Sequence, residues 1–214
     1  MDFSFKEETI LLKNNAARYL KEKCPSSFIK NILKDEKGFS PIIWKEMAEM
    51  GWLGLIYDEQ YGGIGGSFFD LFILLEEMGK VLLPSPFFCS AVLSGLVIRE
   101  AGDANLKAEY LPATIRGEKI LTMGLLDERG RYDYEQPNLE AKESSDGSYA
   151  IKGTRILVPY ANVAHEILVC ANVKGVKAEG PTLLKIHGQA DGQKKIPLDM
   201  LTGEKTFAVV YENV

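Results

Sequence analysis

The sequence predicts an α+β protein in which an N-terminal all-α helical domain, residues 1–118, precedes a small antiparallel β-barrel or sandwich, residues 119–214. Apolar residues recur at helical spacing in the first half and lose that period near residue 117. Beyond it, short runs rich in β-branched and aromatic residues alternate with turns, which is typical of a small all-β domain. The hydrophobic content of 46% and the charged content of 26% are those of an ordinary globular protein.

Composition argues against several classes of protein. The formal net charge is −5 and the basic residues are scattered, unlike the clustered basic surface of a nucleic-acid-binding protein. No apolar run approaches the roughly 20 residues of a membrane span. The first residues are acidic and amphipathic, unlike a secretion signal. We therefore expect a cytoplasmic protein with no membrane segment and no nucleic-acid partner.

Cysteine and histidine give no sign of a metal centre. Cys24, Cys89 and Cys170 lie far apart and form none of the close pairs that hold zinc. His165 and His187 have no cysteine or carboxylate at ligand spacing. We predict no metal and a reducing compartment, in which the thiols stay free.

Cap motifs predict the helices of the first half. Residues 4–7, SFKE, have the form of a capping box before a helix that ends at Pro25. A second helix has Ser40 at its N-cap and Gly51 just past its end. A third helix begins at Ser67, with Asp70 three residues later, and reaches Gly79.

Two further helices complete the helical half. Residues 86–102 are nearly all apolar and predict a buried helix. Residues 105–118 predict a short helix that a proline and a glycine stop. The adjacent Glu76 and Glu77 point apart on a helix, so we interpret this pair as structural and not as an acid–base couple.

Seven short runs predict the strands of the second half. Asp146 and Gly147 form a strong hairpin signal between the first two runs. The last run ends at Val214, which leads us to expect a longer natural protein. The runs are residues 138–144, 148–153, 154–159, 166–173, 181–187, 194–199 and 207–214.

Four glycines in the segment 61–66, YGGIGG, allow two interpretations. Such a segment can hold a phosphate against the backbone, as in a dinucleotide-binding loop, or it can turn the chain. A dinucleotide-binding loop follows a strand within a βαβ unit, and this segment has helical patterns on both sides. The sequence favours a tight turn between helices.

Several motifs, in order, resemble the acyl-CoA dehydrogenase family. The segments YGGIGG…LLEEMGK and AGDANLKAEYLPATIRGEKI are similar to its N-terminal helical domain. The segments DGSYAIKGTRILVPYANVAHEILVCANV and TGEKTFAVVYENV are similar to its middle β-domain. The resemblance covers essentially the whole chain but includes nothing of the family's C-terminal helical domain.

This resemblance implies a reaction. Family members bind FAD and an acyl-CoA thioester, remove the α-proton with a glutamate and transfer a hydride from the β-carbon to the flavin. They usually pass electrons to an electron-transfer flavoprotein, and we expect a homo- or hetero-oligomer when the protein is complete. Because the family's catalytic glutamate lies in the C-terminal domain, we name no catalytic residue in this chain.

The resemblance also implies cofactor and substrate residues. Backbone groups of Leu125, Leu126 and Asp127 would face the flavin, and Asp133 stands where the family has a serine. The strand segment Leu157, Val158 and Pro159 would pack on the flavin face. Pro86, Cys89 and Leu93 would line the base of the acyl pocket.

Three of these positions depart from the family pattern and keep a second interpretation open. Asp127 replaces a threonine and Asp133 a serine, which brings negative charge toward an anionic cofactor. Pro159 occupies a hydroxyl position and has no N–H to donate. The alternative is a flavin-free partner subunit of similar fold. A flavin-dependent oxidase or monooxygenase is a third possibility.

Overall fold

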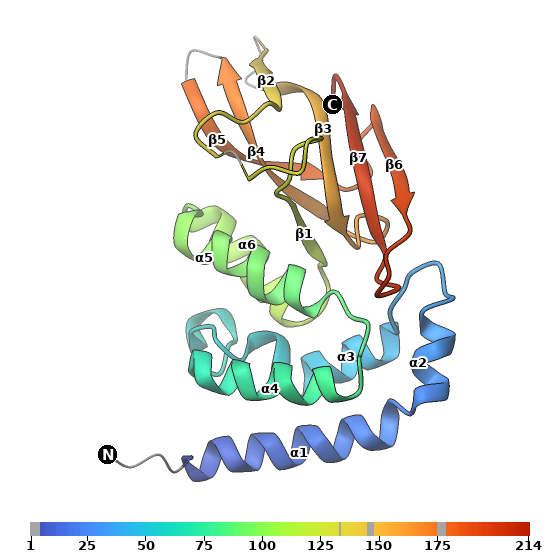
Figure 1. The fold of residues 1–214 in the computed structure, drawn as a ribbon. Helices are drawn as coiled ribbons and strands as arrows, with labels where there is room; N and C mark the ends of the chain where they lie inside the picture. Colours follow the sequence, from blue (N-terminus) through green and yellow to red (C-terminus); the bar gives the residue numbers. More distant parts are fainter. Residues whose placement is uncertain (1–4, 133, 145–147, 175–178) are drawn as a thin grey trace. The chain divides into compact units, whose positions relative to one another are not determined.

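The computed structural model describes residues 5–132, 134–144, 148–174 and 179–214, which fold into two compact units (Figure 1). The helical unit contains the residues up to Ser85 together with Ala104–Glu118. The sheet unit contains Pro86–Asp103 and Lys119–Val214. The boundary between residues 118 and 119, which the loss of helical period indicated, stays a prediction. By packing, the helical segment 86–103 groups with the strands.

The helical unit is built on two helices that pack together, α1 and α4. The Thr9 hydroxyl of α1 donates to Asp70 Oδ1 of α4 over 2.7 Å. No helix among the described residues is long and apolar enough to cross a membrane. The elements of this unit are α1 (Glu7–Lys23), α2 (Ser26–Ile32), α3 (Pro41–Glu49), η1 (Trp52–Gly54), η2 (Glu59–Tyr61), α4 (Phe68–Lys80) and α6 (Ala104–Ile115).

Two of the predicted caps form. Ser67 and Asp70 make a reciprocal capping box at the start of α4, and the Ser40 side chain accepts from the Ile43 amide at the start of α3. The start of α1 differs from the prediction. Its N-cap is Lys6, with no side-chain cap bond, and Ser4 lies outside the described residues.

The sequence predicted that Pro112 helps to stop α6. Instead, Pro112 lies inside the helix. Its carbonyl still accepts from the Arg116 amide over 3.0 Å. The helix ends at Ile115, and Gly117 follows with a φ of 72°. Glycine adopts this left-handed conformation at little cost, so the glycine and not the proline ends the helix.

The glycine-rich segment turns the chain, as predicted. A Cβ on Gly63 would lie 2.0 Å from the Tyr57 carbonyl oxygen, so only glycine fits there. The amides of Gly65 and Gly66 donate to the carbonyls of Tyr57 and Leu55 over 2.8 and 2.7 Å. These amides are bonded within the protein, which leaves them unavailable to a phosphate.

The sheet unit holds one seven-stranded mixed sheet in the order β1-β4-β2-β3-β7-β6, with β5 paired to β4. Strand β4 runs parallel to β1 and β2, whereas every other pairing is antiparallel. The sheet is therefore mixed, whereas the sequence predicted an antiparallel one. The strands are β1 (Leu121–Gly124), β2 (Glu140–Glu143), β3 (Tyr149–Pro159), β4 (Glu166–Lys174), β5 (Glu179–His187), β6 (Gln193–Leu198) and β7 (Thr206–Glu212).

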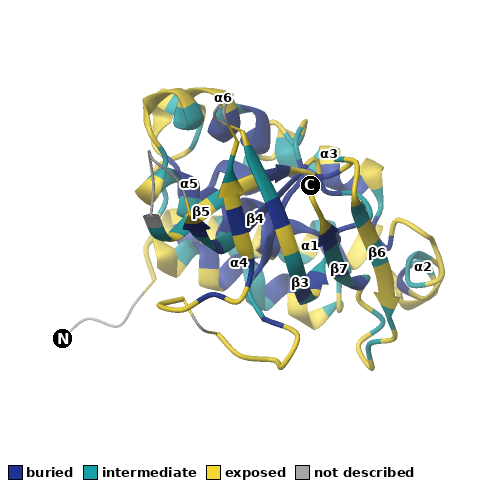
Figure 2. Ribbon diagram, turned by 90° about the horizontal axis from the view of Figure 1, so that it is seen from above, coloured by how far each residue is buried: buried dark blue, intermediate teal, exposed yellow. Residues whose placement is uncertain are grey.

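Strand β3 merges two runs that the sequence separates at Gly153. This glycine has a φ of 140°, and a Cβ on it would lie 2.8 Å from Leu139 Cδ1. It therefore permits close packing within a continuous strand instead of ending one. Figure 2 shows buried, intermediate and exposed residues interspersed along β3. Strands β2 and β3 form the predicted antiparallel pair, and the turn residues Asp146 and Gly147 lie outside the described residues.

Alternating strand residues form the core of the sheet unit. Its buried members are Leu139, Ala141, Ile151, Val158, Ala161, Ala164, Ile167, Val169, Ala171, Val173, Ile186, Phe207, Val209 and Tyr211. The predicted helix over 86–102 consists of a π-helix, η3 (Phe88–Ser94), followed by α5 (Gly95–Ala101). The π-helix packs on β1, where the Leu121 amide donates to Ser90 Oγ over 2.9 Å.

Candidate functional site

The turn that follows β1 closes on itself. The Asp127 amide donates to the Arg131 carbonyl over 3.1 Å, and the Gly130 amide donates to the Asp127 carbonyl over 2.9 Å. Gly130 has a φ of 75°, which such a turn requires. The turn is fastened to β3, because the Ile156 amide donates to the Leu126 carbonyl over 3.0 Å.

The carboxylate of Asp127 is the centre of this turn. Its Oδ1 accepts from the backbone amides of Arg129 and Arg131 over 2.8 and 2.9 Å. Its Oδ2 accepts from Nε and Nη2 of the Arg131 side chain over 2.9 and 2.8 Å. These hydrogen bonds hold the pKa of the Asp127 carboxyl below its usual value. Asp127 is only 4% exposed, so its negative charge is satisfied by donors of the turn itself and is hardly presented to solvent.

The predicted flavin-face segment lies at an irregularity of β3. The β3–β7 register shifts between Arg155 and Val158, and Leu157, inside the shift, has a φ of 52°. Leu157 is 41% exposed, whereas Val158 is fully buried in the sheet core. The carbonyl of Pro159 accepts from the Thr122 hydroxyl over 2.6 Å. Of this segment, Leu157 presents an apolar side chain outward and Val158 has only its backbone to offer.

The predicted acyl-pocket residues lie on or beside the π-helix. Pro86 and Cys89 are buried and Leu93 is half-buried. The Cys89 thiol donates to the Pro86 carbonyl over 3.3 Å, and burial raises its pKa to about 12. A thiol that stays protonated is a poor nucleophile, so Cys89 acts here as a small apolar side chain. Short π-helices occur often at functional sites, and no pattern in the sequence indicated this one.

Strand β1 connects the two predicted groups of residues. Thr122, fully buried on this strand, interacts with the Cys89 thiol and bonds the Pro159 carbonyl. Leu125 and Leu126 continue from the end of β1 into the turn. The structure therefore brings residues from 89, 125–127 and 157–159 to one region of the sheet unit, while Asp133 lies outside the described residues.

Sequence reasoning missed a buried arginine beneath this region. Arg155 of β3 is 3% exposed and donates from Nη2 to the Cys170 carbonyl over 2.6 Å and from Nη1 to Asn138 Oδ1 over 2.7 Å. Burial lowers its pKa, and the charge of Asp127 acts in the opposite direction. Gly124 makes room for the arginine stem, since a Cβ there would lie 3.0 Å from Arg155. The available signal was spacing: Arg155 lies four residues after the apolar Ile151, and the two-residue period of a strand places both on the same face.

The remaining titratable candidates are structural in their contacts. His165 Nδ1 accepts from the Ile120 amide over 2.9 Å, which fastens the strand entry. Lys80 pairs with both Glu76 and Glu77, over 2.9 and 2.7 Å, although these two glutamates are adjacent. Among the described residues no three metal-ligating side chains come together. All three cysteines are free thiols.

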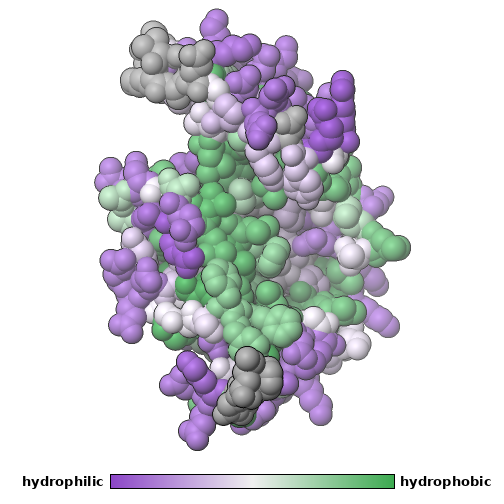
Figure 3. All heavy atoms as spheres, turned by 60° about the vertical axis from the view of Figure 1, so that its left-hand side comes forward, coloured by the Kyte–Doolittle hydropathy of each residue, from purple (hydrophilic) through white to green (hydrophobic). Residues whose placement is uncertain are grey.

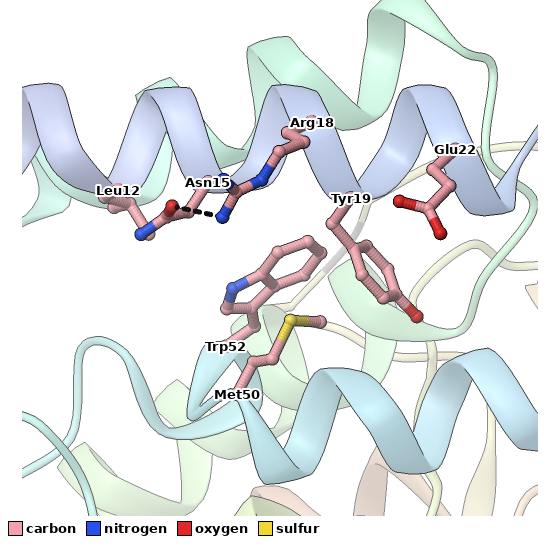
Figure 4. A pocket seen from close by; sticks show the side chains of 7 residues that line it. All are labelled: Leu12, Asn15, Arg18, Tyr19, Glu22, Met50 and Trp52. Carbon is pink, nitrogen blue, oxygen red and sulfur yellow. Dashed lines mark hydrogen bonds between the residues drawn. The ribbon is translucent and has the colours of Figure 1, made fainter.

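The helical unit contains a pocket of about 440 Å³ that the sequence did not predict (Figure 4). The indole of Trp52 and the thioether of Met50 form one wall, and Tyr19 of α1 meets Trp52 edge to face with ring centroids 5.4 Å apart. Arg18 donates to Asn15 at its rim over 3.1 Å. None of the residues predicted for flavin or substrate lines this pocket.

A larger apolar groove of about 710 Å³ lies elsewhere on the helical unit. Phe5, Thr9, Ile64 and Phe69 are among its lining residues. Figure 3 shows apolar side chains gathered at the surface in the lower part of the view. The rings of Phe5 and Phe69 lie 5.4 Å apart, and those of Phe69 and Phe72 lie 6.2 Å apart. These three side chains are termed the phenylalanine patch.

Comparison with known proteins identifies the family and the fold. Residues 6–118 match the family model for the acyl-CoA dehydrogenase N-terminal domain. Acyl-CoA dehydrogenase FadE12 of Mycobacterium tuberculosis is 25% identical over 180 residues, which cover 80% of this chain and 45% of that protein. The chain spans about half the length of the curated relatives it matches.

Two solved structures share the fold along nearly the whole chain. The ChsE4-ChsE5 complex from Mycobacterium tuberculosis has a TM-score of 0.86 at 22% identity and covers 100% of this chain and 56% of its own. An acyl-CoA dehydrogenase complexed with FAD from Bacillus anthracis has a TM-score of 0.86 at 19% identity, with coverages of 99% and 36%. Because the family model matches more than half of the residues, the chain belongs to the acyl-CoA dehydrogenase family.

Proposed function

We propose that the complete protein takes part in the α,β-dehydrogenation of an acyl-CoA thioester, in which a base takes the α-proton and a two-electron acceptor held outside the described residues takes the β-hydride. This chain would supply the N-terminal helical and sheet portions. The family match over residues 6–118 carries this proposal. The buried apolar Pro86 and Cys89 suit the base of an acyl pocket, because they offer no charge to an alkyl chain. The base that removes the α-proton would come from outside residues 1–214.

The turn after β1 and Pro159 do not offer the donors that a flavin needs as the electron acceptor. The nitrogen and carbonyl acceptors of an isoalloxazine require N–H or O–H donors. The amides of Asp127, Arg129 and Arg131 are already bonded within the turn, and Pro159 has no N–H. We therefore derive no step through FAD, although it is the cofactor that the family resemblance implies. We likewise derive no electron transfer to an electron-transfer flavoprotein, although the family resemblance implies that carrier.

This mismatch favours a second candidate function, that of a flavin-free partner subunit. Such a subunit would share the fold and assemble with a different chain that holds the cofactor. The ChsE4-ChsE5 structure is a complex of two named components, and we propose a comparable hetero-oligomer here. The free thiols agree with a cytoplasmic location for this assembly.

One assay separates the two candidates. The full-length protein is purified from its native host, and acyl-CoA oxidation is followed with an artificial electron acceptor. Turnover by a yellow homo-oligomer supports the flavoenzyme, whereas turnover that requires a second, co-purifying chain supports the partner subunit. Residues 1–214 alone should give no turnover. A full-length protein that neither binds nor oxidises butyryl-CoA, alone or with a co-purified chain, would falsify both.

A further inference from the structure

We propose that Asp127 and Arg131 form a lock that withholds the turn after β1 from a flavin. The inference rests on the proposed function, because family membership is what assigns this turn to the cofactor. It goes further by naming two side chains that decide whether the chain can contribute to flavin binding. Both belong to the turn itself, so the lock is a local device.

The donors of the turn are consumed in a closed set of bonds. Three consecutive contacts use backbone amides, since Asp127 donates to the Arg131 carbonyl while Arg129 and Arg131 donate to Asp127 Oδ1. Two more use the Arg131 guanidinium, whose Nε and Nη2 both donate to Asp127 Oδ2. A flavin edge would have to break these charge-assisted bonds before it received a donor from the amides of Arg129 or Arg131 or from the bonded edge of the guanidinium.

Charge acts in the same direction as the bonds. Threonine, the residue usual at position 127 in the family, offers a donor and no charge, whereas aspartate offers only acceptors. An ionised carboxylate also repels the acceptor edge of a flavin and the diphosphate of FAD. The Arg131 guanidinium, which bonds Asp127 Oδ2 through Nε and Nη2, therefore stabilises the carboxylate in place.

The test measures FAD retained by the full-length protein after equilibrium dialysis, read from visible absorbance per chain. Variants are Asp127→Thr, which restores the hydroxyl, Arg131→Ala, which removes the guanidinium, and the double variant. Arg129→Ala is the matched control, because it deletes an equal charge two residues away and leaves the backbone bond to Asp127 intact. Arg131→Lys keeps the charge and loses the planar group.

We expect wild type and the Arg129→Ala control to retain little FAD. The double variant should bind FAD more tightly by roughly tenfold for each donor freed. The Arg131→Lys variant should fall between them. A wild type that binds FAD stoichiometrically and as tightly as the double variant contradicts the lock, and so does a folded double variant with no gain.

Two accompanying measurements keep the outcomes distinct. Thermal unfolding of each variant shows whether it is folded, and the single variants replace the double variant if it is not. Titration with butyryl-CoA reports on the proposed function by itself. If wild type and all variants fail to bind butyryl-CoA while the double variant still gains FAD affinity, the proposed function is wrong and the lock stands. Butyryl-CoA binding without an FAD gain removes the lock alone.

Discussion

Single residues in this chain act mainly through hydrogen-bond demand and backbone space. Asp127 satisfies four donors with one carboxylate, and these include a guanidinium four residues away. The spacing of aspartate, glycine and arginine in DERGR is the only sign of this in the sequence. The side chains of aspartate and threonine are similar in size. Asp127 therefore differs from the threonine usual in the family in its charge and in its lack of a hydrogen-bond donor.

The Asp127 lock should depend on pH. Its pKa is depressed in the folded protein, so its contribution to stability is present above the ordinary carboxyl pKa of about 4 and disappears as pH falls through the folded value. The melting temperature of wild type should exceed that of Asp127→Asn near neutral pH, and the gap should close in acid. Arg131→Ala should likewise melt below wild type near neutral pH, and this difference in melting temperature should also close in acid. A gap that stays constant with pH would show that Asp127 stabilises by packing alone.

Two glycines should respond to alanine with opposite signs. Gly63→Ala places a Cβ 2.0 Å from the Tyr57 oxygen, so the turn must move, at a cost of about 1–3 kcal/mol or more. Gly79→Ala, exposed inside α4 with nothing within 4 Å of the new Cβ, should stabilise by about 1 kcal/mol. Urea unfolding of both variants measures the two changes. If both variants change the free energy of unfolding in the same direction, the space inferred around these two glycines is wrong.

At the scale of elements, the caps at Ser40 and Ser67 were predicted correctly, whereas the start of α1 and the type of the helix over Phe88–Ser94 were not. Ser67 and Asp70 are separated by the spacing of a capping box, and the box forms because both partners are local. The π-helix over Phe88–Ser94 depends on contacts distant in sequence, such as the bond from the Leu121 amide to Ser90. A periodicity argument cannot see such contacts, so it predicts an ordinary helix there.

The end of α4 provides an element-scale prediction. Leu82 has a φ of 53° and is 77% exposed, and its amide and that of Leu83 bond the carbonyls of Gly79 and Met78. This is a Schellman end with leucine where glycine is preferred. Leu82→Gly should stabilise by about 0.5–1 kcal/mol, because steric relief of roughly 1–2 kcal/mol exceeds the entropy cost of glycine.

The neighbouring position is the control for this change. Leu83 is not among the residues with positive φ, so Leu83→Gly gains no relief and should lower the free energy of unfolding. Chemical denaturation of both variants gives the comparison. Destabilisation by Leu82→Gly would mean that the leucine makes contacts that outweigh its strain.

At the scale of the whole molecule, exposed apolar surface is the feature that most affects behaviour. Phe5, Phe69 and Phe72 of the phenylalanine patch are 42%, 47% and 58% exposed. A patch of this kind on a soluble chain often marks an interaction surface. We expect the expressed chain to self-associate, in line with the predicted oligomer.

The phenylalanine patch gives a test of self-association. Phe72→Ser should shift sedimentation toward monomer, because it removes a large exposed apolar side chain without opening the core. Ile42→Ser is the control, since Ile42 is 71% exposed on α3 and is outside the patch. A clean monomer for the unmodified chain, or equal effects of both variants, would exclude the patch as the cause.

The sequence by itself determined the division into a helical and a β-rich half, the caps at Ser40 and Ser67, and the turn at residues 61–66. These depend on local properties, namely hydrophobic period, cap side chains and the backbone freedom of glycine. Its motifs also led to the family.

Only the tertiary structure decided the parallel pairing of β4 with β1 and β2, the π-helix, and the closure of the turn around Asp127. Strand pairing and helix widening depend on which distant segments meet, and one chain's sequence does not encode that in any local pattern. The closure depends on where the Asp127 carboxylate points, because Oδ1 accepts from the amides of Arg129 and Arg131 and Oδ2 from the Arg131 guanidinium. The same carboxylate directed outward would have left those two amides free.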